Sequence, residues 1–242
     1  MAHWTDRTRL LLGEQGMEKL QNARAVVLGL GGVGGNAAEA LCRAGVGHLL
    51  LVDNDTVDET NLNRQLLATR EMVGRPKCEA ALARLRAINP EADLQTAQQF
   101  YLPENSSFVF DFEPDIIIDA IDTVTAKLHL AEQCHQRGVL LYASMGTGNR
   151  LDPSQLRCGD IGETAGTGCP LARVMRRELR KRGVPGLKVV YSLEQPIQGI
   201  NANDGEHGRH SPGSAPFVPP AAGLLLASAA VRDFLEQKQM IG

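Results

Sequence analysis

A short apolar run that ends in closely spaced glycines constrains the fold of this chain more than any other feature of its sequence. The apolar residues 25–28 precede Gly29, Gly31 and Gly34, which fit the pattern GxGxxG. A strand that passes into a helix through such a loop leaves backbone N–H groups free at the helix N-terminus, where phosphate binds. A tight turn without a ligand produces the same pattern, so the loop predicts a nucleotide site without naming the nucleotide.

Strand and helix patterns alternate through the first 144 residues. We expect strands at 25–29, 48–53, 94–98, 115–119 and 139–144, and helices at 10–20, 32–44, 77–88 and 125–137. Gly45, Gly138 and the pair Asn89-Pro90 are typical helix stops. This alternation predicts an α/β fold with a Rossmann-like, doubly wound and mostly parallel sheet.

After Gly146 the regular alternation stops, and we expect an irregular C-terminal extension. It contains a basic helix at 171–182, a strand at 188–192, a loop at 195–220 rich in Gly, Pro, Asn and Ser, and a last helix at 221–237. We find no internal repeat and no second hydrophobic core. The sequence therefore predicts one domain over 1–242, with a nucleotide-binding half at 1–150 and a substrate and dimer half at 151–242.

The composition indicates a reduced, cytoplasmic protein. At 242 residues the chain can bury a sizeable core without disulfides, and its net charge is only -3. Its five cysteines are scattered and never form CxxC, which argues against a structural zinc site. We see no signal peptide in residues 1–16, and the apolar stretch 221–231 is too short to span a bilayer. We therefore expect no membrane partner.

Polar residues after the second strand favour a nucleotide that is cleaved. Asp53 ends that strand, 19 residues after Gly34, where an acid commonly binds ribose hydroxyls. A dehydrogenase would fit equally well up to this point. Cations and amides follow, however, and the departure of pyrophosphate needs such charge neutralisation: Asn61, Arg64, Gln65 and Lys77. Surface exposure of Arg64 and Lys77 is the alternative.

Two carboxylates flank the end of the fourth strand. Asp119 and Asp122 lie where ligands of doubly wound sheets bind, and magnesium prefers one or two carboxylates together with phosphates. We expect Asp122 to bind the metal. Asp119 either supports Asp122 or caps the following helix, because helix starts favour Asp.

Taken in order, these residues resemble the ATP-dependent carboxylate-adenylating enzymes of the ubiquitin-activating, ThiF and MoeB type. The resemblance runs from Arg7 to Ser144 and includes GxGGxG, DxD, NLNRQ and the lysine of GRPK. It implies a homodimer in which Arg7, or failing that Arg9, reaches the partner's triphosphate. It implies magnesium at Asp122 and ATP at the following residues: Gly29, Gly31, Gly32, Gly34, Asp53, Asp55, Asn61, Arg64, Gln65 and Lys77. The catalytic residues implied are Arg7, Arg64, Lys77 and Asp122.

The second half resembles one branch of this family, the tRNA threonylcarbamoyladenosine dehydratases. The resemblance rests on Asp152-Pro153, Gly159-Asp160-Ile161, the run 169–173, the run 189–192 and the run 213–219. It implies adenylation of the threonylcarbamoyl carboxylate of a modified adenosine in tRNA, followed by ring closure. Cys169 and Glu163 depart from the branch, which often has Asp and Lys at these positions.

Three alternatives remain open at the level of sequence. An activating enzyme for a sulfur-carrier or ubiquitin-like protein would use a protein C-terminus as its carboxylate and could have a sulfur-transfer protein as partner. Cys169 could then be an acceptor thiol, although a cysteine before Pro170 at a helix start is more commonly buried or a cap. A non-catalytic nucleotide-binding module is the second alternative, and a dehydrogenase is the third. A basic stripe favours an RNA substrate, although a solvated helix face would look the same: Arg173, Arg176, Arg177, Arg180, Lys181 and Arg182.

Overall fold

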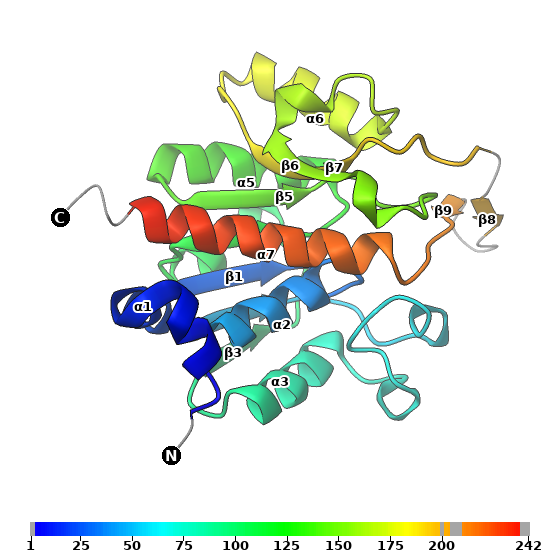
Figure 1. The fold of residues 1–242 in the computed structure, drawn as a ribbon. Coiled ribbons are helices and arrows are strands. Elements are labelled where there is room, and N and C mark those ends of the chain that lie inside the picture. Colours follow the sequence, from blue (N-terminus) through cyan, green and yellow to red (C-terminus); the bar gives the residue numbers. More distant parts are fainter. Residues whose placement is uncertain (1–2, 199–200, 204–209, 238–242) are drawn as a thin grey trace.

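The computed structural model describes residues 3–198, 201–203 and 210–237. Its centre is a seven-stranded sheet (Figure 1). The strands are β1 (Arg24–Leu28), β2 (His48–Val52), β3 (Asp93–Ala97), β4 (Ile116–Asp119), β5 (Leu140–Ser144), β6 (Leu156–Asp160) and β7 (Lys188–Ser192). Their order is β3-β2-β1-β4-β5-β7-β6, and only the pair β6 and β7 is antiparallel. The prediction of a doubly wound, mostly parallel sheet is confirmed.

Helices cover both faces of this sheet, as Figure 1 shows. One face carries α1 (Asp6–Gln21), α2 (Gly34–Ala44), α3 (Lys77–Ile88) and α7 (Val218–Gln237), and the other carries α4 (Ser107–Phe110), α5 (Val124–Arg137) and α6 (Pro170–Lys181). Neighbouring residues of a strand point to opposite faces, so Val27 joins the first core and Val26 joins the second. Both faces of β1 are buried, which explains its unbroken apolar run.

The register of the strands brings their carboxyl ends to one edge. Leu28, the last residue of β1, pairs with Val52 of β2 and with Asp119 of β4. Val52 in turn pairs with Ala97 of β3, and Asp119 pairs with Ala143 of β5. The loops that follow these five strands therefore leave the sheet side by side, which is where ligands of such sheets bind.

The structure corrects several predicted boundaries. α1 begins at Asp6 and is kinked at Gly13, and α7 begins at Val218 because prolines are tolerated in a first helical turn. The strand β6 was missed altogether. The loop predicted at 195–220 contains two short paired strands, β8 (Asn201–Asn203) and β9 (His210–Pro212). Residues 199–200 and 204–209 of that loop lie outside the described residues.

The helix α7 is, by length and composition, long and apolar enough to cross a membrane, so the prediction that limited the apolar stretch to 221–231 and judged it too short was wrong. The qualifying stretch is Val218–Glu236, of which 56% is buried inside the protein. Val218, Ala222, Leu226 and Ala230 recur every four residues and are fully buried in the first core. Both facts fit a core helix that packs against the sheet and α2.

Candidate active site

A cavity of about 770 Å³ opens at the carboxyl edge of the sheet. Its walls come from the loops after β1, β2, β3, β4 and β5 and from the segment before α7. Most of the residues selected from the sequence line it together: Gly29, Gly31, Gly32, Asp53, Asp55, Asn61, Arg64, Gln65, Lys77 and Asp122. The structure thus gathers into one hollow residues that are spread over more than ninety positions of the chain.

The glycines of the loop differ in what requires them. Gly29 has φ +86, and a side chain at Gly34 would place its Cβ 1.7 Å from the Gly29 carbonyl oxygen. A Cβ at Gly31 would meet nothing closer than 3.9 Å, so this backbone lies open to the cavity. Gly29 and Gly34 therefore make the turn possible, and Gly34, predicted with the others to contact nucleotide, does not line the cavity.

An acidic pair and a buried lysine form the floor of the cavity. The Asp53 carboxylate accepts hydrogen bonds from the backbone N–H groups of Leu30 (2.6 Å) and Asp55 (2.8 Å). Lys77, the first residue of α3, donates to Asp55 Oδ2 at 2.8 Å and lies 4.0 Å from Asp53 Oδ1. Since the Lys77 side chain is only 7% exposed, its charge is held at the cavity and is not a solvated surface charge.

The segment 58–65 positions the amides and the arginine. Asn61 accepts from the Asp58 N–H at 3.2 Å and so closes a capping turn. The Arg64 guanidinium donates through Nη1 to the Thr60 carbonyl and to Asn63 Oδ1, each at 2.8 Å. Gln65 is buried beside them. The arginine is therefore held from one side while it lines the cavity.

Asp119 neither caps α5 nor reaches the cavity. It is fully buried and forms an ion pair with Lys127, whose Nζ lies 3.0 Å from Asp119 Oδ1. Thr123 occupies the N-cap position of α5. Burial raises the pKa of the Asp119 carboxyl above its ordinary value, although Lys127 opposes this shift. The pair lies directly under the loop that carries Asp122.

Lys127 was missed by sequence reasoning, although the chain contained a signal for it. Lys127, Leu130, Ala131 and Cys134 recur at the spacing of one helix face, and all four are buried. A lysine within an apolar stripe needs an anionic partner. Asp119, at the end of the preceding buried strand, was the available candidate.

Asp122 is exposed on the rim of the cavity. Among the residues that the structure describes, no three His, Cys, Asp or Glu side chains cluster as a metal site. Magnesium commonly takes one or two carboxylates and fills its remaining positions with water and phosphate oxygens. One carboxylate beside a glycine loop of the type that binds phosphate fits that ion and would not suit a metal that needs a full protein cage.

Comparisons with known proteins decide the family. A family model described as the ThiF family matches residues 5–231. This chain belongs to the ThiF family. The tRNA threonylcarbamoyladenosine dehydratase of Bacillus subtilis is 41% identical over 246 residues, covering 98% of this chain and 96% of that protein. The crystal structure of the E. coli tRNA N6-threonylcarbamoyladenosine dehydratase in complex with ATP superposes with a TM-score of 0.88 at 31% identity, covering 98% of this chain and 96% of that chain.

A relative with sulfurtransferase in its name, the class closest to the sulfur-carrier alternative, is also similar to this chain. An adenylyltransferase and sulfurtransferase of Ogataea parapolymorpha is 37% identical over 134 residues, which cover 55% of this chain and 34% of that protein. The likeness to the dehydratases therefore extends through both halves of this ThiF-family chain, whereas the likeness to this sulfurtransferase covers about half.

The cavity of this ThiF-family chain also has walls that the sequence did not reveal. Phe100 is 62% exposed at the rim, while Tyr101 beside it is buried and hydrogen-bonded to His129 Nδ1 at 2.8 Å. Burial raises the pKa of Tyr101 and lowers that of His129. Residues 144–148 form the opposite wall.

Two departures from the dehydratase branch have structural roles in the described chain. Cys169 is buried at the N-cap of α6, where its Sγ accepts from the Ala172 N–H at 3.5 Å. The Glu163 carboxylate accepts from the Asp160 N–H at 2.8 Å and from the Tyr191 hydroxyl at 3.4 Å. All five cysteines are free thiols.

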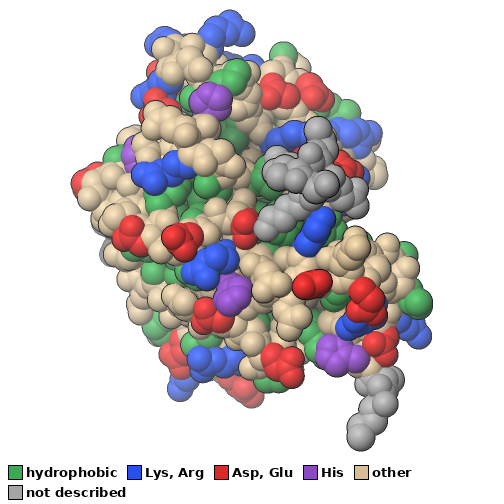
Figure 2. Space-filling model, turned by 90° about the vertical axis from the view of Figure 1, so that its left-hand side faces the viewer, with side chains coloured by type: hydrophobic (Ala, Val, Ile, Leu, Met, Phe, Trp, Pro, Cys, Tyr) green, Lys and Arg blue, Asp and Glu red, His purple; other side chains and the backbone are tan. Residues whose placement is uncertain are grey.

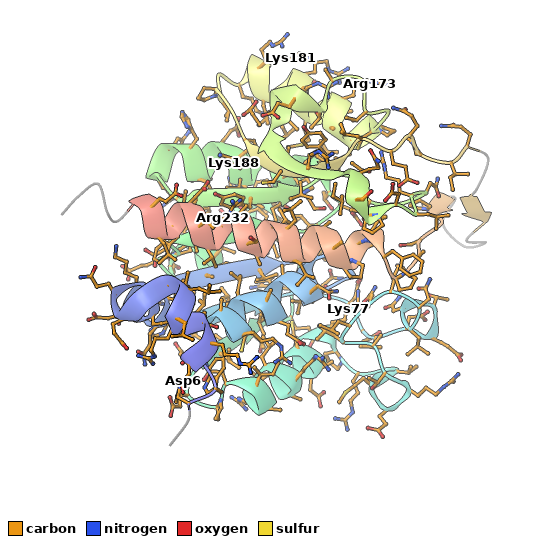
Figure 3. All side chains as sticks on the ribbon, in the orientation of Figure 1. Asp6, Lys77, Arg173, Lys181, Lys188 and Arg232 are labelled. Carbon is orange, nitrogen blue, oxygen red and sulfur yellow. The ribbon has the colours of Figure 1, made fainter. Side chains whose placement is uncertain are left out.

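The basic stripe lies on α6 and at its C-terminal end, on the sheet face that also carries α5. Figure 3 shows Arg173 and Lys181 there, far from Lys77. Three of the six cations surround Glu178, and their hydrogen bonds lower the pKa of that carboxyl to about 2: Arg177, Lys181 and Arg182. Arg173 and Arg180 are exposed. By contrast, the face at the amino ends of the strands mixes basic and acidic side chains (Figure 2).

Arg7 lies away from the cavity of its own chain. It is exposed on α1, the helix at the amino edge of the sheet in Figure 1, and does not line the cavity.

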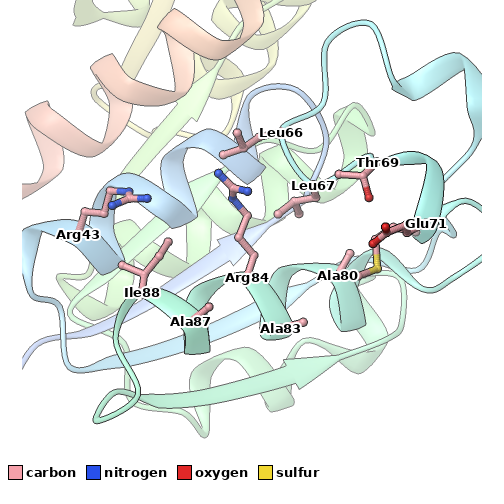
Figure 4. Close-up of a pocket in the computed structure, with 11 residues that line it drawn as sticks. Arg43, Leu66, Leu67, Thr69, Glu71, Ala80, Ala83, Arg84, Ala87 and Ile88 are labelled. Atoms are coloured by element: carbon pink, nitrogen blue, oxygen red, sulfur yellow. The ribbon is translucent and has the colours of Figure 1, made fainter.

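A second hollow of about 420 Å³ lies between α2, α3 and residues 66–72 (Figure 4). Its walls are mostly apolar, and Arg43 and Arg84 at its edge both pair with Glu39. None of the residues predicted to bind nucleotide lines it.

Proposed function

We propose that this ThiF-family chain adenylates the threonylcarbamoyl carboxylate of a modified adenosine in tRNA and then closes it into a ring. The observation that carries the proposal is the single cavity that gathers Asp53, Arg64, Lys77 and Asp122. The likeness to the Bacillus subtilis dehydratase, which covers 98% of this chain and 96% of that protein, supports the choice of substrate.

The first step is attack of the substrate carboxylate on the α-phosphate of ATP. An acyl-adenylate forms, and pyrophosphate leaves with the bonding electron pair. Lys77 and Arg64 would neutralise the phosphate charge as it develops, and Asp53 would bind the ribose. Asp122 would hold magnesium, which supplies further neutralisation of phosphate charge.

In the second step, a group of the same nucleoside attacks the acyl carbon, and AMP leaves. Because nucleophile and electrophile belong to one molecule, proximity supplies much of the rate, and no nucleophilic side chain is required. The buried capping position of Cys169 agrees with a reaction that does not pass through this thiol.

We also propose that the chain works as a homodimer and as one domain over 1–242. Leu10 and Leu11 are 86% and 85% exposed on α1, one turn from Arg7. A second copy that packs on these exposed leucines would bring its own surface close to Arg7, so that Arg7 could reach the site of the second copy. The single sheet takes strands from both halves, which supports one domain.

The exposed cations of α6 are the proposed tRNA surface. Arg173 and Arg180 project from a helix whose other cations are largely paired with Glu178. Phosphate contacts make affinity fall steeply with salt. Replacing both arginines with glutamine should raise the KM for tRNA and flatten its salt dependence while leaving the KM for ATP unchanged. A tRNA-modifying role also agrees with the predicted cytoplasmic location.

The test is incubation of the protein with ATP, magnesium and tRNA carrying threonylcarbamoyladenosine, followed by mass analysis of nucleosides. Loss of one water from the modified nucleoside is the expected result. Arg64→Ala and Asp122→Ala should abolish tRNA-dependent pyrophosphate exchange without lowering the melting temperature. Arg70→Ala removes an exposed arginine six positions after Arg64 and should leave the exchange intact. Wild-type turnover in either site variant would overturn the assignment.

A second outcome would favour the sulfur-carrier alternative. If tRNA stays unchanged and the C-terminus of a small sulfur-carrier protein is captured as an adenylate, the substrate assignment is wrong. A sulfur-transfer protein would then be the partner, whereas the Ogataea parapolymorpha relative carries both adenylyltransferase and sulfurtransferase in its own name.

A further inference from the structure

A short segment joins the two sides of the candidate site. Residues 212–217, here called the strap, run from the last residue of β9 to the start of α7 (Figure 1). Pro212 and Ser214 of the strap line the cavity. The strap is bonded to the segment 144–150, which includes the cavity wall 144–148, because the Asn149 N–H donates to the Gly213 carbonyl at 2.7 Å. It is bonded to the nucleotide side because Asn63 Nδ2 donates to the Ser214 carbonyl at 2.9 Å.

Asn63 makes a second contact with the opposite end of its amide. Its Oδ1 accepts from Arg64 Nη1 at 2.8 Å. A flipped amide would place oxygen against the Ser214 carbonyl and NH₂ against the guanidinium, so the two contacts together fix one orientation. Arg64, Asn63 and Ser214 therefore form a continuous chain from the phosphate-binding residue to the strap.

A ligand bound to Arg64 can affect this series of hydrogen bonds from Arg64 through Asn63 to Ser214. Its described side-chain hydrogen bonds, to Thr60 and Asn63, both use Nη1. The Nε and Nη2 edge can take a phosphate in the two-pronged geometry that arginine favours. A phosphate bound there would restrict the guanidinium while leaving its contact with Asn63 intact.

The backbone near the glycine loop adds a steric link between the same parts. A Cβ at Gly32 would lie 3.2 Å from the Arg64 carbonyl oxygen and 3.1 Å from Pro219 Cβ. Pro219 follows the strap in the first turn of α7. The phosphate-binding loop, Arg64 and the end of the strap are thus in close packing, where a shift of one is felt by the others.

We propose that Asn63 is a positioning residue that transmits phosphate binding at Arg64 to the strap. With nucleotide bound, the chain through Asn63 holds the strap against residues 144–150 and closes the rim on which the second substrate must dock. The inference rests on the proposed function in taking ATP as the ligand of Arg64. It adds that bound ATP stabilises the rim that the carboxylate substrate meets.

The test is hydrogen exchange of the strap amides and of the Asn149 N–H, with and without magnesium and α,β-methylene ATP, which cannot be cleaved at the α-phosphate. Saturation is confirmed by calorimetry for each variant. In the wild type we expect nucleotide to slow this exchange by about 2- to 10-fold, the range that one hydrogen bond provides. Asn63→Asp keeps an acceptor for Arg64 but has no donor for Ser214, so the slowing should vanish.

Two further variants separate coupling from general damage. Asn63→Gln retains both amide groups and should restore the slowing at least in part. Asn22→Ala removes an exposed amide that also donates to a backbone carbonyl, that of Glu18, at the other edge of the sheet, and should behave as wild type. Full slowing in Asn63→Asp, or a wild-type strap that ignores bound nucleotide, overturns the inference. Wild-type protein that does not bind the analogue overturns the proposed function as well.

Discussion

Lys127→Met removes a cation that is buried beneath the candidate site. The Lys127 Nζ lies 3.0 Å from Asp119 Oδ1, and neither side chain is exposed. Removing one partner of a buried ion pair leaves an uncompensated buried charge, which costs about 3–5 kcal/mol. For a chain of this size we expect the melting temperature to fall by roughly 6–20 °C.

The double variant Lys127→Met with Asp119→Val should behave differently. Because burial raises the pKa of Asp119 despite the attraction of Lys127, the charged pair is costly to maintain. Apolar replacement of such a pair is often neutral, or stabilising by about 1–4 kcal/mol. We therefore expect the double variant to regain wild-type stability. Adenylation should nevertheless be impaired in the double variant, since Asp119→Val also removes the acceptor of the Ile121 N–H beside Asp122, which lies 3.2 Å from Asp119 Oδ1.

Urea unfolding of the wild type, both single variants and the double variant measures the coupling, and pyrophosphate exchange measures activity. Lys181→Met is the control, because that side chain is 65% exposed and surface ion pairs contribute about 0–1 kcal/mol. A loss below about 1 kcal/mol in Lys127→Met, or a double variant less stable than Lys127→Met alone, would refute the reasoning.

Three further predictions concern the glycine loop, a histidine and a cysteine. Gly34→Ala should unfold the chain or sharply lower its melting temperature, since its Cβ would meet the Gly29 carbonyl oxygen at 1.7 Å. Gly31→Ala should stay folded and show a lower ATP affinity in calorimetry. Equal melting temperatures of the two variants would contradict this prediction. Burial holds the pKa of His129 below 6.5, so the unfolded chain binds a proton more readily and the free energy of unfolding falls as pH drops below 6.5. Urea unfolding at several pH values measures this dependence. His129→Gln should remove the contribution of His129 to it, and an unchanged dependence on pH would contradict the prediction. Cys169→Ser keeps an acceptor for the helix N-terminus and should retain full dehydratase activity, while complete inactivation in a folded variant would favour an acceptor thiol.

Elements with strong local signals were predicted closely. α3 has the predicted bounds, because Asn89-Pro90 ends it where the sequence requires, and β7 also matches. The strand β6 gave no such signal, because Arg157, Gly159 and Asp160 are poor strand formers. It exists because it pairs with β7, about thirty residues further along the chain.

The candidate site divides in the same way. The sequence indicated which residue types gather at the carboxyl edge, since each follows a recognisable strand or belongs to a family motif, and the cavity contains most of them. It gave no sign that Asn63 reaches Ser214, which lies 151 positions away. It also gave no sign that Gly34 packs so closely against the Gly29 carbonyl that only glycine fits there.

By itself, the sequence determined the glycine turn, the C-terminal ends of α2, α3 and α5, and the family, because these depend on residues adjacent in the chain or on the order of motifs. Only the tertiary structure decided that Asp119 belongs to Lys127, that Cys169 caps a helix and that the strap meets Arg64 through Asn63. The physical reason is that the partner of a side chain depends on strand register and helix packing, and these are fixed only when the whole sheet forms.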